Sequence, residues 1–302
     1  MIPFVIGTRR SPLALFQAEL VKSLMESARA DVSVSIKTIV TTADVMPEAR
    51  IAAMGGKGVF VKEIEEALLS GEIDAAAHSL KDVPAALPEG LHLSRFLPRI
   101  DPRDALLSRG GCSVDQLPYG ARVGTSSPRR AAWALHRRPD LRIEPFRGNV
   151  DTRLRKLEQG EVDATFLAAA GLRRLGLWDT YRPYIRPIDA HDCVPAVGQG
   201  IIALETRVGD VRAHALTDAI GCADSEAQAR CERAFLAQFG EGSCTQPIGA
   251  ISEFSRGKVT LHAFAASLDG SFVVRRTGYA PAEQAEKMAA EIGEALLRSM
   301  PY

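Results

Sequence analysis

FVIGTRRSP at residues 4–12 and ARVGTSSPRR at residues 121–130 follow one pattern, an apolar run, then Gly-Thr, then Ser-Pro. A short apolar run is typical of a buried strand, and proline is well tolerated in the first turn of a helix. Each stretch therefore predicts a strand that turns directly into a helix. Because the pattern occurs twice, the sequence predicts two related α/β lobes in series.

The segments around these stretches extend both lobes. In the first lobe, VSVSIKTIV (32–40) alternates as a strand does, a helix is expected over about 59–70, and the apolar run 73–77 predicts a further strand. In the second lobe, LRIEPF (141–146) predicts a strand, and QGEVDATFLA (159–168) repeats the pattern of SGEIDAAAHS (70–79). Strands that alternate with helices indicate mainly parallel sheets. VGQGIIALE (197–205) predicts another strand, which could return to the first lobe.

The last part of the chain has a different pattern. DSEAQARCERAFLAQF (224–239) predicts a helix that Asp224 or Ser225 can cap. Antiparallel strands are expected over 245–252 and 259–276, the second interrupted by a turn at Asp269-Gly270. A closing helix is expected from about Pro281 to Arg298. The predicted domains are lobe 1 (1–99 and 198–217), lobe 2 (104–192) and a small C-terminal α+β domain (220–302).

Composition excludes several classes of protein. The chain has 302 residues with 37 basic and 37 acidic side chains, and this balance argues against a general nucleic-acid binder. There is no signal-peptide pattern and no apolar stretch long enough to span a membrane. The cysteines are odd in number and form no CxxC pair, which argues against a disulfide framework and a zinc ribbon: Cys112, Cys193, Cys222, Cys231 and Cys244. We expect a cytoplasmic enzyme without a metal.

IDAAAHSLKDVP (73–84) is the first candidate for a functional site. Its apolar run ends in His78, Lys81 and Asp82. Ligands of open α/β sheets bind at the carboxyl ends of strands, so this end is a candidate binding edge. A carboxylate at Asp82 could stabilise a cation that develops on a substrate, or could move protons. The alternatives are a strand end with solvated charges and a salt bridge from Asp82 to Lys81 or to a nearby arginine.

Basic and hydroxyl residues cluster at three strand-to-helix turns. They are Arg9, Arg10 and Ser11, then Thr125, Ser126, Ser127, Arg129 and Arg130, then Arg147, Gly148 and Asn149. Helix N-termini offer free N–H groups, and arginine binds carboxylates through paired N–H bonds. The three turns together predict a site for a polyanion, either a carboxylate or a phosphate compound. The alternative is that each arginine is a solvated helix end.

Two loops complete the candidate site. GGKGVFVKE (55–63) lacks the spacing of a phosphate-binding P-loop, so we expect Lys57 on a glycine-rich flap. Cys244 lies in GEGSCTQPIGA, a loop in which a thiol is more reactive than in a core. Cys231, by contrast, is expected on the buried face of its helix.

Taken together, these motifs resemble one family along nearly the whole chain. HSLKDVP, GTRRSPLAL, GGKGVFVKE, GTSSPRR, RGNVDTRL, AAAGLRRLG, PAVGQG and SCTQPIGA are similar to the motifs of the porphobilinogen deaminases, also called hydroxymethylbilane synthases. The resemblance implies a monomeric transferase of heme biosynthesis that joins four porphobilinogen molecules into linear hydroxymethylbilane and releases ammonia. It also implies two lobes similar to those of periplasmic binding proteins.

The resemblance assigns roles to residues. A dipyrromethane cofactor is expected on Cys244 through a covalent bond, and Asp82 is expected to be catalytic, because positive charge develops on the pyrrole nitrogens during condensation. The residues expected to bind the cofactor are Arg9, Ser11, Lys81, Asp82, Thr125, Ser127, Arg129, Arg130, Arg147 and Gly148. Those expected to bind the substrate porphobilinogen are Arg9, Lys57, Arg147, Arg153, Arg174 and Gln199.

The chain departs from the family pattern at a few positions. Pro128 stands where leucine is common, Ala53 and Met54 occupy a stretch that sometimes holds a second lysine, and Val194 replaces a leucine. Two rival functions remain open at this point. One is a non-catalytic two-lobe protein that binds carboxylates or other anions, and the other is the ligand-sensing module of a regulator, which the neutral charge and the lack of a helix-turn-helix candidate disfavour.

Overall fold

The computed structural model describes residues 1–42, 61–240 and 245–300. The chain forms two compact units, one made of Met1–Ile100 and Ile201–Ala229, the other of Asp101–Gly200 and Arg230–Tyr302. The second unit thus contains the second lobe together with the C-terminal sheet. The boundaries proposed for three separate domains stay a prediction.

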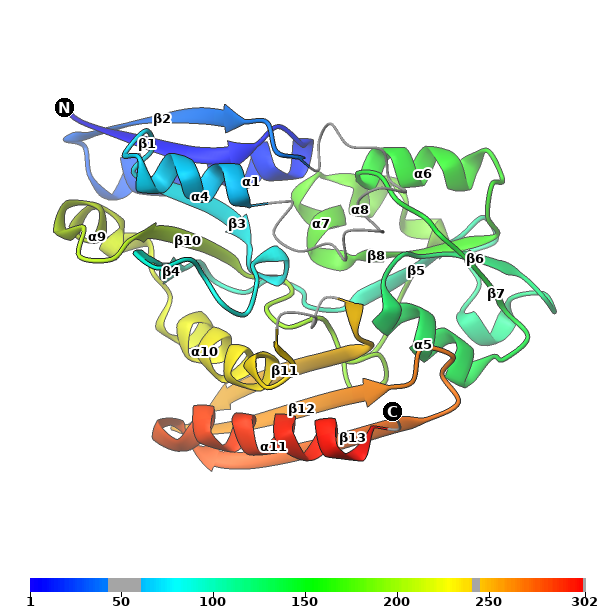
Figure 1. The fold of residues 1–302 in the computed structure, drawn as a ribbon. Coiled ribbons are helices and arrows are strands. Elements are labelled where there is room, and N and C mark those ends of the chain that lie inside the picture. The colour runs from blue at the N-terminus through cyan, green and yellow to red at the C-terminus, as the bar shows by residue number, and fades with distance from the viewer. Residues whose placement is uncertain (43–60, 241–244, 301–302) are drawn as a thin grey trace. The chain divides into compact units, whose positions relative to one another are not determined.

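The first unit is built on a five-stranded sheet in the order β2-β1-β3-β10-β4 (Figure 1). Its strands are β1 (Ile2–Arg9), β2 (Val32–Ile39), β3 (Ala75–Ser79), β4 (Leu91–Phe96) and β10 (Ile202–Arg207), and its helices include α1 (Pro12–Ala28), α4 (Lys62–Leu69) and α9 (Val211–Thr217). β1 pairs in parallel with β2 and β3, whereas β10 is antiparallel to both of its neighbours. The strand expected near residue 200 therefore does return to the first lobe.

The second lobe repeats this plan with the order β7-β6-β8-β5-β9. Its strands are β5 (Asp104–Ser108), β6 (Arg122–Gly124), β7 (Arg142–Glu144), β8 (Ala164–Ala168) and β9 (Ile185–Pro187), and its helices are α5 (Pro128–Arg137), α6 (Val150–Glu158), α7 (Ala169–Arg174) and α8 (Leu177–Thr180). β6 is parallel to β7 and β8, and β5 is the antiparallel strand. The duplication read from the two Gly-Thr…Ser-Pro stretches, and with it the α/β fold class, is confirmed.

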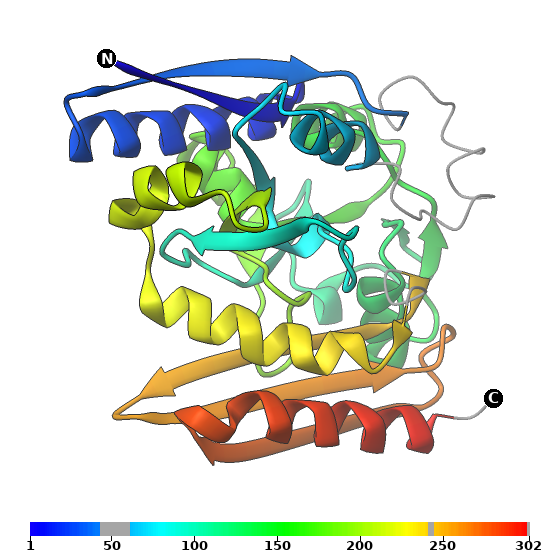
Figure 2. The same cartoon turned by 60° about the vertical axis from the view of Figure 1, so that its left-hand side comes forward.

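The C-terminal part forms a three-stranded antiparallel sheet, β11-β12-β13, against which α11 packs (Figures 1 and 2). The elements are α10 (Ala223–Ala237), β11 (Ile248–Ser255), β12 (Lys258–Ala266), β13 (Val273–Pro281) and α11 (Ala285–Ser299). As expected, Cys231 is fully buried in the core beneath this sheet, beside Phe235. A second core, which contains Trp133, Phe166 and Phe264, joins the sheet to the second lobe.

Three boundary predictions were wrong. The closing α-helix begins at Ala285, after a 3₁₀ turn over Ala282–Gln284, and Pro281 itself pairs with Lys258 as the last residue of β13. α10 begins at Ala223, so Asp224 lies inside the helix and does not cap it. β11 spans Ile248–Ser255, a few residues later than the expected 245–252. At Pro281, pairing with the distant residue Lys258 fixed a boundary that local sequence signals left open.

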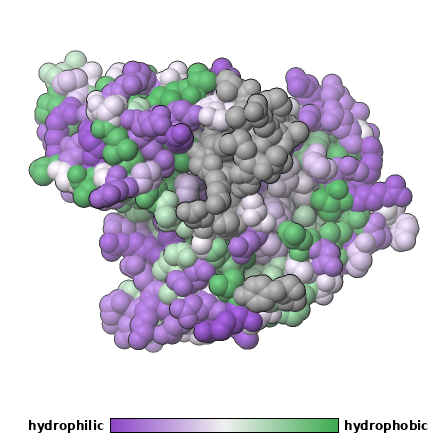
Figure 3. Space-filling view, in the orientation of Figure 1, coloured by the Kyte–Doolittle hydropathy of each residue, from purple (hydrophilic) through white to green (hydrophobic). Residues whose placement is uncertain are grey.

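The hydropathy of the surface and the character of the helices can be compared with what the sequence predicts. The face of the molecule seen in Figure 3 mixes hydrophilic residues with scattered apolar ones. In the described part of the chain, no helix combines the length and apolar character that crossing a membrane requires.

Candidate functional site

At the end of β3, His78 is buried, whereas the candidate site residues Lys81 and Asp82 follow in a turn. β3 is buried between β1 and β10, and a short 3₁₀ turn, η1 (Leu80–Asp82), follows it. Leu80 is buried and its N–H donates to the carbonyl of Ile201 at 3.0 Å. This anchored turn leaves Lys81 half-buried and Asp82 exposed. The carboxylate of Asp82 is therefore accessible to a ligand.

His78 points away from that ligand edge. Its Nε2 lies 3.0 Å from Oε2 of Glu205, and both side chains are buried. Glu65 of α4 is buried as well, and this burial, followed by the neighbouring charge of Glu205, raises the pKa of Glu65 to about 7. His78 thus belongs to a buried acid–imidazole cluster that fixes the strand leading to Asp82.

This cluster predicts a measurable pH dependence of stability. Because the pKa of Glu65 is raised on folding, its contribution is greatest below the unfolded pKa near 4.5 and is lost as the pH rises towards 7. We expect the stability of the parent, measured relative to Glu65→Gln, to fall by roughly 2–3 kcal/mol between pH 4.5 and 8. Urea unfolding of both proteins across this range measures the difference. A difference that stays constant with pH would show that Glu65 titrates normally.

In the first unit, a second group of predicted residues follows β1. Arg9 ends β1, and the hydroxyl of Ser11 caps α1 by accepting from the N–H of Ala14 at 3.3 Å. β1 and β3 are parallel neighbours, so their carboxyl ends lie at the same edge of the sheet. The topology therefore brings Arg9 and Ser11 to the edge that also presents Lys81 and Asp82.

The turn between β6 and α5 is organised by its hydroxyl groups. Thr125 Oγ1 accepts from the N–H of Ser127 at 3.1 Å, and Ser127 Oγ caps α5 by accepting from the N–H of Arg130 at 3.5 Å. Pro128 is the first residue of α5, a position at which its missing N–H costs nothing. The departure from leucine at this position is therefore compatible with the helix.

Arg129 and Arg130 are buried and share one acid. Asp104 is fully buried, and its carboxylate lies 2.7 Å from Nη1 of Arg129 and 2.6 Å from Nη2 of Arg130. Burial alone would raise the pKa of Asp104, but the two guanidinium groups outweigh burial and hold that pKa well below its usual range. Gln199 is also buried, and its amide donates to the same carboxylate at 3.0 Å. We call these four residues the Asp104 cluster.

Three members of the Asp104 cluster were predicted from the sequence as site residues, and Asp104 itself was not. Arg129, Arg130 and Gln199 were expected to face ligands, and the structure brings the three together around an acid that sequence reasoning did not single out. Two guanidinium groups share one carboxylate, so the cluster holds one surplus positive charge. Asp104 could have been identified from the sequence, because it is a charged residue at the start of a mostly apolar strand, and that strand is wholly buried.

The turn after β7 presents Arg147. Gly148 has a φ of 116°, and a Cβ there would lie 2.8 Å from Cγ2 of Thr152, so this position requires glycine. The Gly148 carbonyl accepts from Nε of Arg153 at 2.9 Å, and Asn149 caps α6. Arg147 is half-buried, and no ion pair joins it to an acid within residues 1–42, 61–240 and 245–300. β7 runs parallel to β6, so this turn lies at the same sheet edge as Thr125 and Ser127.

Arg174 is a second cation without a described acid. It ends α7, and its Nη2 donates to the carbonyl of Gly200 at 2.8 Å. Burial lowers the pKa of Arg174 to about 10, and no acid in the described part of the chain offsets this effect. An anionic ligand beside the guanidinium would supply the missing negative charge. Lys57 and Cys244 lie outside the described residues.

Comparison with known proteins gives consistent results. A family profile described as "Porphobilinogen deaminase, dipyromethane cofactor binding domain" matches residues 4–215, and one described as "Porphobilinogen deaminase, C-terminal domain" matches residues 227–298. A curated protein of Syntrophotalea carbinolica named porphobilinogen deaminase is 47% identical over 292 residues, which cover 97% of this chain and 91% of that protein.

Solved structures show a more distant similarity. The VFT2 domain of Bordetella pertussis BvgS, as a double mutant, is 18% identical with a TM-score of 0.45 and covers 72% of this chain and 85% of that one. A periplasmic sulfonate-binding protein, SsuA of Methylobacillus flagellatus, is 14% identical with a TM-score of 0.42, covering 81% of this chain and 72% of that one. These similarities concern the fold alone.

Proposed function

Because this chain belongs to the porphobilinogen deaminase family, we propose that Asp82 and the arginines of the two sheet edges carry out the family's reaction. The chain is a transferase that condenses porphobilinogen into hydroxymethylbilane, with release of ammonia. The non-catalytic anion-binding alternative is not favoured, since the family match covers both lobes and the C-terminal domain.

The residues present fit a dipyrromethane cofactor, which the matched cofactor-binding domain implies. The group carries several carboxylates, and the second unit offers the surplus positive charge of the Asp104 cluster together with Arg147 for them, and Arg174 for the carboxylates of the substrate. When bound, the cofactor supplies the pyrrole carbon to which the first substrate unit is joined. The observation that best supports the proposal is Arg174, whose buried charge no described acid neutralises.

Asp82 is proposed as the catalytic acid–base and electrostatic residue. Its carboxylate is exposed after the end of a buried strand, with basic residues as neighbours along the sheet edge. A fixed carboxylate of this kind can accept pyrrole N–H bonds and stabilise positive charge as it develops. Lys81, Arg9 and Ser11 would then bind carboxylates of the cofactor and substrate.

The other predicted residues are assigned by the same reasoning. Thr125 and Ser127 would bind cofactor carboxylates with Arg147 and the backbone at Gly148, and the Asp104 cluster would act through its net charge. Arg153, Arg174, Gln199 and Lys57 are proposed to bind substrate. We further propose that the enzyme is a monomer and that it is cytoplasmic, and the free thiols of its described cysteines fit a reducing compartment.

The attachment of the cofactor to Cys244 has a direct test. Intact mass spectrometry of the parent should show an excess that corresponds to two linked pyrroles, and Cys244→Ser should lack it. Cys222→Ser, which removes a half-buried cysteine elsewhere, is the matched control and should keep the excess. Retention of the added mass by Cys244→Ser would overturn the assignment.

Substitution by lysine should have different effects on activity and stability at Arg147 and at Arg130. Lysine keeps the charge but loses paired N–H geometry. Arg147→Lys should impair chain elongation with stability unchanged, since no described acid pairs with Arg147. Arg130→Lys should lower stability as well, by about 1–3 kcal/mol, because it breaks hydrogen bonds within the buried Asp104 cluster. The distribution of enzyme-bound intermediates by mass spectrometry, together with urea unfolding, measures both effects. Normal elongation by Arg147→Lys would remove Arg147 from the site.

A further inference from the structure

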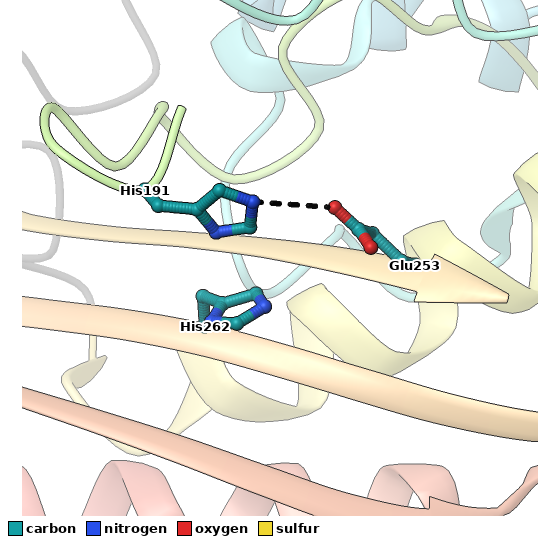
Figure 4. A group of neighbouring side chains, drawn as sticks. All are labelled: His191, Glu253 and His262. Carbon is teal, nitrogen blue, oxygen red and sulfur yellow. Dashed lines mark ion pairs between the residues drawn. The ribbon is translucent and has the colours of Figure 1, made fainter. Parts of the chain in front are cut away.

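Three side chains with metal-binding atoms meet on the surface of the second unit, apart from every residue assigned above. They are His191, Glu253 and His262, and their ligand atoms all lie within 4.8 Å of one another (Figure 4). We propose that these three side chains bind a divalent metal ion, and that this ion is Zn²⁺.

The fold places the three residues independently of a metal. β11 and β12 pair with Ile251 opposite His262, so Glu253, two residues beyond Ile251, lies on the same face as a diagonal neighbour of His262. His191 comes from the loop after β9. That loop is held in place, because the N–H of His191 donates to Oδ1 of Asp189 at 2.7 Å and Arg275 of β13 donates to the carbonyl of Asp192 at 2.8 Å.

The orientation of His262 suits a metal ligand. Its Nδ1 lies 3.1 Å from the hydroxyl of Thr277 on the neighbouring strand, so Nε2 is the atom left to bind a metal. Metal-binding histidines are usually oriented in this way by a hydrogen bond from their other nitrogen.

The remaining distances also suit a metal. Nε2 of His191 lies 3.7 Å from Oε1 of Glu253, longer than a hydrogen bond, and the imidazoles of His191 and His262 meet edge to face at 4.4 Å. Zinc binds histidine at about 2.0–2.1 Å, which sets tetrahedral ligands about 3.3 Å apart. His191 and Glu253 are exposed and can close the remaining distance by rotating. Two imidazoles and a carboxylate are a zinc ligand set, with water in the fourth position.

The competing interpretation is an ordinary surface ion pair between His191 and Glu253. Such a pair involves neither His262 nor its contact with Thr277, whereas a metal site needs both. No metal was expected from the sequence, because it lacks a CxxC pair and because ligands drawn from three distant segments form no recognisable spacing.

Calorimetric titration of the metal-free holoenzyme with Zn²⁺ tests the proposal. The parent should bind one equivalent at this site, and His262→Gln and Glu253→Gln should each lose that equivalent. Thr277→Val removes only the orienting hydroxyl and should weaken binding by about 10–100-fold. Zinc should also raise the melting temperature of the parent but not of His262→Gln, because a bound ion would fasten the 188–192 loop to the sheet.

The other close histidine pair of the chain provides a matched control. Nε2 of His92 lies 2.8 Å from Nε2 of His214 in the first unit. His92→Gln therefore also removes an imidazole that lies close to a second histidine. The His92→Gln protein should still bind the equivalent that His262→Gln loses. The proposal is overturned if the parent binds no zinc, if His262→Gln binds as the parent does, or if only His92→Gln abolishes binding.

Discussion

Asp82→Asn is expected to release ammonia about a hundredfold to a thousandfold more slowly than the parent in single-turnover experiments with cofactor-loaded enzyme. Asparagine keeps the shape and one acceptor oxygen but removes the negative charge. The charge is needed only as positive charge develops on the pyrrole nitrogens, so substrate binding should survive while the rate collapses. The structure adds that Asp82 is exposed and can reach a ligand without rearrangement of the buried strand.

Two further variants separate charge from position. Asp82→Glu retains the charge and displaces it by one methylene, so partial activity should remain. Asp224→Asn removes an exposed aspartate from α10 and should leave the rate unchanged. If Asp82→Asn matched the parent, Asp82 would be no more than a surface acid, and a different carboxylate would have to be sought.

The fold could be predicted from the sequence wherever local patterns agreed with distant contacts. The Gly-Thr…Ser-Pro stretches gave β1–α1 and β6–α5 correctly, because proline at a helix start and a buried strand before it are local signals. Pro281 shows the limit of such signals. It suits the first turn of a helix equally well, and only its pairing with Lys258 assigns it to β13.

The candidate site could be predicted only in part, for a similar reason. A sequence shows which residues follow a strand but not which of them face inward. His78 lies beside Lys81 and Asp82 in the chain, yet it points into the core towards Glu205, whose partnership depends on β10 joining the first sheet. Arg129 and Arg130 were expected to bind ligand carboxylates, but an acid that precedes them by more than twenty residues already pairs with both.

Asp104→Asn should be the most destabilising of the substitutions considered. Asparagine would leave two buried guanidinium groups without their counter-charge, and removal of one partner from a buried ion pair costs about 3–5 kcal/mol. Urea unfolding at pH 7 measures this loss. Asp218→Asn is the matched control, since it breaks the ion pair of Arg95 with an exposed acid and should cost less than about 1 kcal/mol.

Acid should reduce the advantage of the parent over Asp104→Asn. The pKa of Asp104 is lowered on folding, so its contribution is complete above the unfolded pKa near 3.8 and is lost progressively as the pH falls below that value. The stability difference between parent and variant should therefore shrink between pH 5 and pH 3. An equal difference at both pH values would mean that the Asp104 carboxylate does not set the stability of the cluster.

The cofactor-loaded and cofactor-free forms of Asp104→Asn should also differ. If the surplus positive charge of the Asp104 cluster attracts cofactor carboxylates, the loaded variant has a substitute anion and should lose less stability than the unloaded one. Equal losses in the two forms would show that Arg129 and Arg130 serve the fold alone. In that case, Arg147 would be the arginine of the second unit left, among those assigned to the cofactor, to bind its carboxylates.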